Sequence, residues 1–357
     1  MSLNIDSHNF LCHVVSPLTD RQNIARLKTQ MTKSKVSWER IIHLANNHLM
    51  IAALWIGLYE KELDSELENG VRDYLQEIHT LNLRRNQGLK RQAIEAIDVL
   101  NKKGIVPMLI KGAIQLFQPV HRNFGARIMT DLDILVPVGR MDEAVKALNQ
   151  IEYKIQNIPN VDWNSHRHFA PMVRPGEYGS IELHRSALGR YADHILTTAD
   201  IWAKAEYCDT NGVRFKVPNT THSILLGILH SQIGHGYHQR LMLDYKGLHD
   251  RIVMTGHQTR RVEWDQIRNR LSNLGLSRVL RTHMWTAHRL FNLPLQSDIG
   301  PTAYTRIYHG LFMSRIRWAI VDELFEIFFD SFIVCLRKRF GPLKQLLPLR
   351  LVFRKIN

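Results

Sequence analysis

The stretch RIMTDLDILVPV, residues 127–138, decides the fold because two aspartates interrupt a segment with the composition of a buried strand. Side chains alternate between the faces of a strand, so Asp131 and Asp133 share one face while Leu132 and Ile134 share the other. Charged side chains are rarely buried unless they are paired or bind a metal ion. Two carboxylates this close repel each other unless a cation lies between them. The stretch therefore predicts a site for a hard divalent cation such as Mg²⁺, which prefers oxygen ligands.

A third acidic residue extends this prediction. The stretch SIELHR, residues 180–185, has the pattern of another strand, with Glu182 on the face opposite its apolar neighbours. If that strand pairs beside the two aspartates, three carboxylates converge, and the third could bind the metal that holds an acceptor hydroxyl and help to remove its proton. A pair of divalent ions about 3.5–4 Å apart suits such a trio. His184 shares the face of Glu182, so it either contacts phosphate or orients the carboxylate, or is a plain packing or surface histidine.

The stretch LIKGAIQLF, residues 109–117, supplies a candidate for the phosphate side of such a site. It runs from a short apolar strand through Lys111 and Gly112 into a segment that reads as the start of a helix. A helix N-terminus after a glycine presents free backbone N–H groups and a positive dipole end to an anion. Lys111 and Arg127 would add positive charge against a triphosphate. Taken singly, each feature also has an ordinary structural reading, as a turn glycine, an exposed strand face or a salt-bridge partner.

The hydrophobic pattern divides the chain into helical ends and a mixed centre. Apolar residues recur at three- and four-residue spacing before Gly104 and again beyond about residue 192, which predicts helices. Between these ends, strands and helices alternate, which predicts an α+β fold with a small mixed β-sheet core flanked by helices. Asn211 and Gly212 are expected to form the turn of a further strand pair. The predicted divisions are a loose lead-in over 1–35, a helical N-terminal region over 36–103, the core over 104–218, a helical C-terminal domain over 219–335 and a basic amphipathic tail over 336–357.

The composition favours a globular protein with anionic partners. The 357 residues carry a formal net charge of +14, with 19 additional histidines, which suits nucleotides, nucleic acid, acidic glycans or anionic lipid. Three cysteines far apart in the sequence argue against a disulfide scaffold or a structural zinc site. The first residues lack the pattern of a signal peptide, and no apolar run approaches the ~20 residues of a membrane-spanning helix. We therefore expect a cytoplasmic protein.

Three further segments carry charge or histidine. The spacing of the histidines in HSQIGHGYH, residues 230–238, disfavours zinc, and His230 and Asp244 read as a buried polar pair between helices or as part of a site. The stretch HRHF, residues 166–169, could touch a base or an acceptor, or it is an exposed strand entrance. The tail could lie on an anionic membrane, dock on the protein's own helices or contact nucleic acid. Its basic residues are Arg337, Lys338, Arg339, Lys344, Arg350, Arg354 and Lys355.

In their order along the chain, these motifs resemble the nucleotidyltransferase superfamily of the DNA polymerase β type. The stretches LIKGAIQLF, TDLDILV, IELH, LHSQIGH and RLMLDY resemble more closely the bacterial uncharacterised nucleotidyltransferase family, over about residues 75–290. Members of that family are often found near polysaccharide-biosynthesis genes. The sequence departs from the superfamily pattern at Gly112-Ala113, where Gly-Ser or Gly-Gly is usual, and at Glu182, where aspartate is commoner.

The resemblance implies an activity and a set of site residues. The activity is transfer of a nucleoside monophosphate from an NTP such as ATP to an acceptor hydroxyl, with release of pyrophosphate. Catalysis of this kind depends on positioning and on neutralising the phosphoryl oxygens. The implied catalytic residues and ligands of Mg²⁺ or Mn²⁺ are Asp131, Asp133 and Glu182, and the candidate nucleotide-binding residues are Lys111, Gly112, Arg127 and His184.

The acceptor leaves several functions open. A sugar, a lipid carrier or a protein side chain would fit a role in polysaccharide biosynthesis. The net charge of +14 keeps RNA or tRNA as an alternative acceptor. A non-catalytic nucleotide-binding scaffold from a glycan locus is a third hypothesis, which the intact trio of acids disfavours. Metal-dependent binding of NTP would separate the enzyme from the scaffold.

Overall fold

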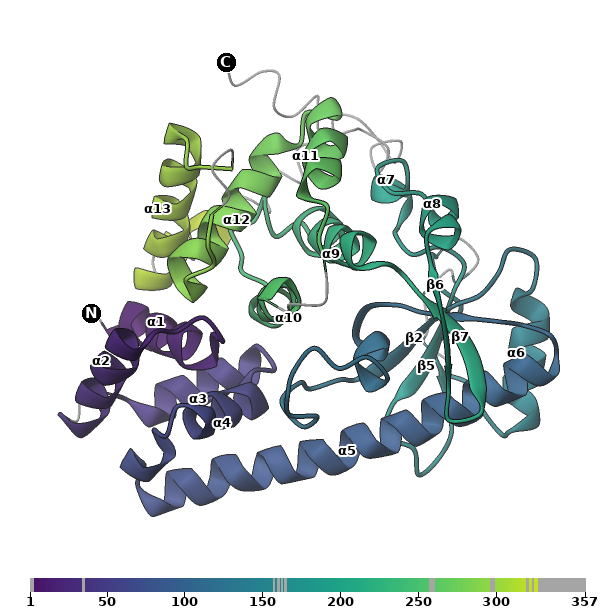
Figure 1. The fold of residues 1–357 in the computed structure, drawn as a ribbon, viewed down its shortest axis with the longest axis horizontal. Coiled ribbons are helices and arrows are strands. Elements are labelled where there is room, and N and C mark those ends of the chain that lie inside the picture. Colours follow the sequence, from purple (N-terminus) through teal and green to yellow (C-terminus); the bar gives the residue numbers. More distant parts are fainter. Residues whose placement is uncertain are drawn as a thin grey trace.

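The computed structural model describes residues 3–33, 36–156, 158, 161, 163, 166–256, 261–295, 299–318, 321–322 and 324–326. A β-sheet lies against the long helix α5, and the N- and C-terminal helices lie together beside it (Figure 1). The predicted mixed α+β fold with helices at both ends is confirmed. The predicted basic tail over 336–357 falls outside the described residues.

The sheet has seven strands in the order β3-β4-β5-β2-β1-β7-β6. Strand β2 is central, because it pairs in parallel with β5 and antiparallel with β1. Parallel and antiparallel pairs therefore occur together, as the alternating pattern of the sequence predicted. The strands are β1 (Met108–Leu109), β2 (Asp131–Leu135), β3 (Lys154–Ile155), β4 (Met172–Val173), β5 (Ser180–His184), β6 (Glu206–Thr210) and β7 (Val213–Val217).

One face of the central strands forms a closed apolar core. Leu132 and Ile134 of β2 and Ile181 and Leu183 of β5 are fully buried in a single hydrophobic cluster. The same cluster contains apolar side chains from α5 and α6. Burial of each such side chain stabilises the fold by roughly 1.5–3 kcal/mol relative to exposure. The apolar positions of the strands thereby fix which face is left for the carboxylates.

The helices account for most of the remaining chain. They are α1 (Leu3–Val15), α2 (Arg21–Thr32), α3 (Trp38–Asn47), α4 (Ile51–Glu60), α5 (Asn69–Lys102), α6 (Met141–Gln150), α7 (Arg190–Asp193), α8 (Thr198–Ala203), α9 (Thr220–Ile228), α10 (Tyr245–Gly256), α11 (Trp264–Asn273), α12 (Ser277–Phe291) and α13 (Ala303–Arg317). Three shorter or irregular turns complete the set. These are the 3₁₀ helices η1 (Asp64–Glu66) and η2 (Lys111–Leu116) and the π-helix η3 (Leu229–Gly234).

The prediction of a loose lead-in over 1–35 is wrong, because α1 and α2 are helices within this range. Leu11, Cys12 and Val14 of α1 have no exposed surface and belong to a cluster shared with α4 and α12. Asp20 accepts a hydrogen bond from the Asn23 backbone N–H, at 2.8 Å, and so caps α2. The stabilising contacts come from other helices, α3 and α4 as well as α12 and α13, which explains why the local pattern of α1 was weak.

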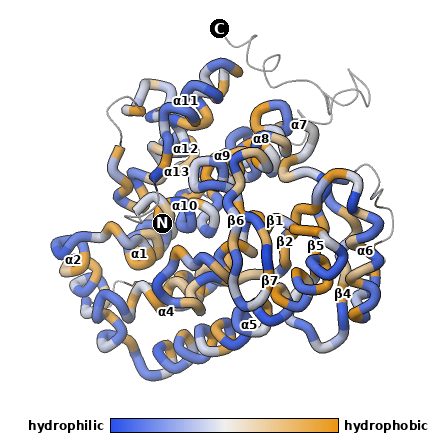
Figure 2. The backbone as a smooth tube through the Cα atoms, turned by 45° about the vertical axis from the view of Figure 1, so that its right-hand side comes forward, coloured by the Kyte–Doolittle hydropathy of each residue, from blue (hydrophilic) through white to orange (hydrophobic). Residues whose placement is uncertain are grey.

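Helix α5 ends at Lys102, before the division predicted at residue 103, but its buried residues belong to two hydrophobic cores. Its first buried residue, Leu75, packs in the cluster of the terminal helices, whereas Leu89 and Leu100 pack beneath the sheet. Polar and apolar segments alternate along α5 in Figure 2, as expected for a helix that buries one side. The helix therefore belongs to both cores, and the division of the chain into domains stays a prediction.

The hairpin between β6 and β7 confirms the expected turn. Asn211 and Gly212 have backbone φ angles of 53° and 78°, and Thr210 pairs with Val213 across the turn. Two successive positive φ angles are typical of the tight turn that follows the twist of a hairpin. Among the helices that the structure describes, none is both long enough and apolar enough to cross a membrane.

Candidate active site

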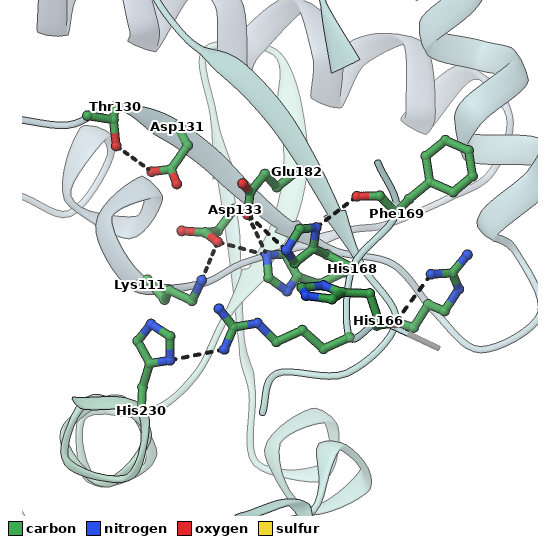
Figure 3. A network of polar contacts seen from close by, with 12 residues as sticks. Lys111, Thr130, Asp131, Asp133, His166, His168, Phe169, Glu182 and His230 are labelled. Carbon is green, nitrogen blue, oxygen red and sulfur yellow. Dashed lines mark hydrogen bonds and ion pairs between the residues drawn. The ribbon is translucent and has the colours of Figure 1, made fainter. Parts of the chain in front are cut away.

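Strands β2 and β5 bring the acidic residues together from positions far apart in sequence. In the parallel pairing, Asp133 is the register partner of Glu182, and Asp131 is the partner of Ser180. Because register partners point to the same face, the two acidic strands carry their carboxylates side by side. Figure 3 shows Asp131, Asp133 and Glu182 gathered on this face. The adjacency expected between the two strands is therefore present.

Asp133 is the most enclosed of the three acids, with 3% of its surface exposed. The ammonium of Lys111 and Nε2 of His184 both approach its Oδ1, at 2.5 and 2.7 Å. Burial raises the pKa of Asp133, but the charge of Lys111 and the contact with His184 outweigh it and hold the pKa well below the usual range. Asp133 is thus ionised at neutral pH.

Glu182 lies beside the same imidazole and a second one. Its Oε2 is 3.6 Å from Nε2 of His184 and 3.8 Å from Nε2 of His168. Burial raises the pKa of Glu182, whereas the neighbouring His184 lowers it, and the net shift is downward. Nδ1 of His168 lies 2.8 Å from the backbone carbonyl oxygen of Phe169 and donates a hydrogen bond to it. Nε2 of the same ring therefore faces Glu182.

Asp131 differs from the other two acids in its electrostatics. Burial is the largest cause that raises the pKa of Asp131, and the negative charges of Asp133 and Glu182 raise it further. The positive charges of Lys111 and Lys246 have a smaller, opposite effect. Its nearest hydrogen-bond donor is the hydroxyl of Thr130, at 3.3 Å. A carboxylate that is repelled by two others and weakly compensated gains most from a bound cation.

The donor set suits a divalent cation. One ligand atom each from Asp133, Glu182 and His184 lie within 4.8 Å of one another, a spacing that one metal ion can bridge. Lys111 already supplies a positive charge to Asp133, so the ammonium occupies part of the space in which a metal would meet this oxygen. Lys111 also has a left-handed backbone, with φ of 53°, which is uncommon for a residue other than glycine and is often found at functional sites.

The predicted phosphate-binding segment differs from the expectation in its local structure. From Lys111, before Gly112, the chain forms the short 3₁₀ helix η2 instead of the α-helix expected after the glycine, so a strong helix dipole is absent from this element. Gly112 also leaves space for Arg127, because a Cβ at this position would lie 2.4 Å from Nη1 of that residue. The glycine therefore makes room for the guanidinium to pass over the backbone.

Arg127 is paired with a residue that the sequence reading missed. Its Nε donates to Oδ2 of Asp250 at 2.8 Å, and Nε2 of His121 lies 3.0 Å from Oδ1 of the same carboxylate. Burial raises the pKa of Asp250, but Arg127 and His121 outweigh it and hold the pKa well below the usual range. The only signal for Asp250 in the sequence was its position on the apolar side of the helical segment 245–256.

A cavity of about 390 Å³ opens beside Asp131 and Asp133. It lies between η2, β2, η3 and the first turn of α10, so it joins the sheet to the C-terminal helices. Lys246 lines it as a further cation that sequence reasoning missed; burial and the nearby Arg127 lower the pKa of Lys246. The polar side chains on its wall are those of Asn47, His48, Lys111, Gln115, Arg127, Thr130, Asp131, Asp133, Ser223, His230, His235, Tyr237, Asp244, Tyr245, Lys246, Asp250 and Arg251.

The reading of His230 and Asp244 as a mutual pair is wrong. His230 contacts Arg167 and His235, whereas Asp244 accepts from the Gly247 N–H at 2.9 Å and contacts Arg251. Both residues line the cavity instead, because η3 and the first turn of α10 face it from different directions.

The reading of HRHF as an exposed strand entrance is also wrong for one residue. His168 has only 6% of its surface exposed and forms a β-bridge with His184 of β5. Burial lowers the pKa of His168, which keeps the imidazole neutral. The stretch therefore reaches the carboxylate face, where the His166 ring meets the His168 ring edge-on and the His168 ring contacts that of His184, with ring centroids 4.3 and 5.1 Å apart.

Comparison with known proteins assigns the chain to a family. The model of the family described as "Uncharacterised nucleotidyltransferase" matches residues 34–292, and no curated protein matches. One similar solved structure is that of an antigenic nucleotidyltransferase-like protein from Paracoccidioides brasiliensis, at 14% identity, 60% coverage of this chain, 93% coverage of that chain and a TM-score of 0.31. A TM-score this low does not by itself establish a shared fold. The family match covers most of the chain, including all three acids, and the chain therefore belongs to the uncharacterised nucleotidyltransferase family.

Proposed function

We propose that this protein is a metal-dependent nucleotidyltransferase that transfers a nucleoside monophosphate from an NTP to an acceptor hydroxyl. The observation that carries the proposal is the register of β2 and β5, which sets Glu182 opposite Asp133 on the face that carries Asp131. The adjoining cavity, lined by Lys111 and Arg127, gives a nucleotide a place beside these acids. Family membership supports the reaction class.

In this proposal, Asp131, Asp133 and Glu182 hold Mg²⁺ or Mn²⁺. A bound divalent cation neutralises the charge that develops on the phosphoryl oxygens. The acceptor oxygen forms a bond to the α-phosphorus, the bond to the bridging oxygen breaks, and pyrophosphate leaves with that electron pair. Glu182 takes the hydroxyl proton, and His184 orients Asp133 through its 2.7 Å contact. Lys111 leaves Asp133 and turns toward the phosphates.

A hydroxyl-rich acceptor, such as a sugar of polysaccharide biosynthesis, suits the surroundings. A second cavity of about 370 Å³ shares Ile114, Ser223 and Met254 with the first. Its remaining wall is mostly polar, which favours hydrogen bonding to hydroxyl groups. Those polar residues are Gln118, Glu206, Asn219, Thr220, Thr221, Arg261 and Glu263. A lipid carrier or a protein side chain is the alternative acceptor, and a cytoplasmic site of action, where NTPs are available, belongs to the proposal.

The test uses each NTP labelled at the α- or the γ-phosphate, incubated with the full chain, Mg²⁺ or Mn²⁺ and a cell extract. We expect α-label, and no γ-label, to become attached to an acceptor, with an Asp133→Asn variant at least about 1,000-fold slower. Asp209→Asn is the matched control, because Asp209 is an exposed carboxylate of β6 paired with Arg214. Equal transfer by the wild type and the Asp133→Asn variant would refute the proposal.

RNA is a second acceptor class, which the net charge of +14 favours. Treatment of the labelled product with ribonuclease separates the two classes. Label released by ribonuclease, together with salt-sensitive retention of RNA by the protein, would identify an RNA acceptor. Label that survives ribonuclease and is released by glycosidases would identify a glycan.

A further inference from the structure

Arg167 and His230 meet at the edge of the candidate active site, although 63 positions separate them. Nη1 of Arg167 is 3.1 Å from Nδ1 of His230. Arg167 directly precedes His168, whose Nε2 faces Glu182, and His230 lines the cavity beside Asp133. Figure 3 shows Lys111 between Asp133 and His230, so the contact lies next to the ammonium of Lys111.

The contact fixes the protonation of two histidines. A guanidinium has only donors, so Nδ1 of His230 must accept from Arg167 and the proton of the neutral ring lies on Nε2. Nε2 of His230 is 3.2 Å from Nε2 of His235, which therefore accepts in turn. Burial, followed by the charges of Lys111 and Arg167, lowers the pKa of His230 to about 2, in agreement with a neutral ring. His230 thus holds the guanidinium without neutralising its charge.

Arg167 differs in its charge balance from the other arginine at the site. Arg127 is neutralised by Asp250, whereas no carboxylate of the described residues lies within 4.0 Å of the Arg167 guanidinium. The Nε–H of Arg167 is buried and has no hydrogen-bond partner within the described part of the chain. A buried, unpaired donor on a charged group is costly and is usually satisfied by water, an ion or a ligand. The lone N–H and the uncompensated charge both call for an anion.

The element that carries His230 is irregular as well. His230 belongs to η3, a π-helix that interrupts the helical segment begun by α9. Such π-turns are frequent at functional sites, because they redirect one side chain out of the regular spiral. The irregular turn gives an independent reason to place His230 and its arginine in the site.

We propose that Arg167, held by His230, is a phosphate-binding residue of this site. The inference rests on the proposed nucleotidyl transfer and adds a positioning pair that the carboxylates do not supply. A planar guanidinium beside an ammonium matches the geometry of a phosphate group, with Lys111 contacting the same or the adjacent phosphate. The phosphate belongs either to the triphosphate of the NTP or to a phosphorylated acceptor, because Arg167 lies on the Glu182 side, where the acceptor would approach.

The test measures ligand binding to the full chain by calorimetry in the presence of Mn²⁺. Its readout does not depend on nucleotidyl transfer. One arm titrates the α,β-methylene analogue of each NTP, and the other titrates inorganic phosphate into the complex saturated with the analogue that binds most tightly. The variants are Arg167→Gln and, as the matched control, Arg185→Gln, since Arg185 bonds the Trp163 carbonyl and stacks on Phe169. His230→Leu removes the acceptor for Arg167, and His230→Asn restores an oxygen near the position of Nδ1. Thermal melting confirms that each variant is folded.

We expect Arg167→Gln to lower the affinity for either the analogue or inorganic phosphate by about tenfold or more. The affinities of Arg185→Gln should stay within about twofold of those of the wild type. His230→Leu should follow Arg167→Gln, and His230→Asn should recover most of the affinity. A loss confined to the analogue assigns the phosphate to the NTP, and a loss confined to inorganic phosphate assigns it to the acceptor. Unchanged affinity in both arms would overturn the inference and leave the proposed function standing. A wild type that binds no analogue would instead contradict the proposed function itself.

Discussion

The two faces of strands β2 and β5 are built from the same ten residues and have opposite properties. On one face, Leu132, Ile134 and their neighbours on β5 are fully buried against α5 and α6. On the other, Asp131, Asp133 and Glu182 lie together, and the two aspartates line a cavity. The apolar face contributes stability, whereas like charges on the other face cost stability and make a metal site possible. One strand can therefore anchor the fold on one face and carry the candidate site on the other, because its side chains alternate between the two faces.

The largest expected effect is on the apolar face. Replacing Leu132 with Ala should lower the free energy of unfolding by about 3 kcal/mol, because it removes a fully buried side chain and leaves a cavity. Denaturant titration measures the loss. The folded fraction should still bind Mn²⁺ with wild-type affinity, and a large loss of metal affinity would show that the two faces are not independent.

The next effect is on the carboxylate face. Glu182→Gln should slow transfer of α-label by about 100-fold or more, since the variant loses a charge from the proposed metal site and the proposed proton acceptor. Single-turnover rates with the labelled NTP measure it. Asp209→Asn is again the control, because Asp209 is an exposed acid on β6 of the same sheet and pairs with Arg214. Equal rates for the two variants would remove Glu182 from the mechanism.

A smaller effect is expected on the free energy of unfolding, which should rise when Asp131 is replaced with Asn and fall when Asp133 is replaced with Asn. The pKa of Asp131 is raised, so its ionisation opposes folding, and the penalty grows as pH rises from the usual range through the folded pKa. At pH 7 without metal, Asp131→Asn should therefore raise the free energy of unfolding by about 1 kcal/mol. The gain should vanish near pH 3, where Asp131 is protonated in both states.

Asp133 should behave in the opposite way. Its pKa is held well below the usual range, so its stabilising effect is complete above that range and is lost as pH falls toward the folded pKa. Asp133→Asn should lower the free energy of unfolding at pH 7 by about 1–3 kcal/mol, because Lys111 loses its partner. Urea titrations between pH 3 and 8 compare the two variants, and shifts of the same sign at pH 7 would contradict this electrostatic account.

The smallest effect is expected at the rim of the carboxylate face. Thr130→Val removes a single hydroxyl contact, 3.3 Å long, to Asp131 from an exposed residue. The free energy of unfolding should change by less than about 0.5 kcal/mol, and transfer should fall by less than about fivefold. A larger loss of activity would mean that Thr130 sets the orientation of Asp131.

Much of the fold and the acid trio could be predicted from the sequence, because the signals are local. Alternation in 127–138 and 180–185 identified the face of each acid, and Asn211-Gly212 identified a hairpin. The prediction of a loose lead-in over 1–35 failed because α1 is stabilised by packing against other helices, α3 and α4 as well as α12 and α13, and not by its own local pattern. Nucleotide-binding roles for Lys111, Gly112, Arg127 and His184 stay predictions.

By itself, the sequence determined which side chains share a face, because the two-residue period of a strand needs no knowledge of the rest of the chain. Only the tertiary structure decided the register that sets Glu182 opposite Asp133, the pairing of Arg127 with Asp250 and the approach of Arg167 to His230. The physical reason is that such contacts join residues separated by 49 to 123 positions, so they depend on how the whole core packs and not on any local pattern.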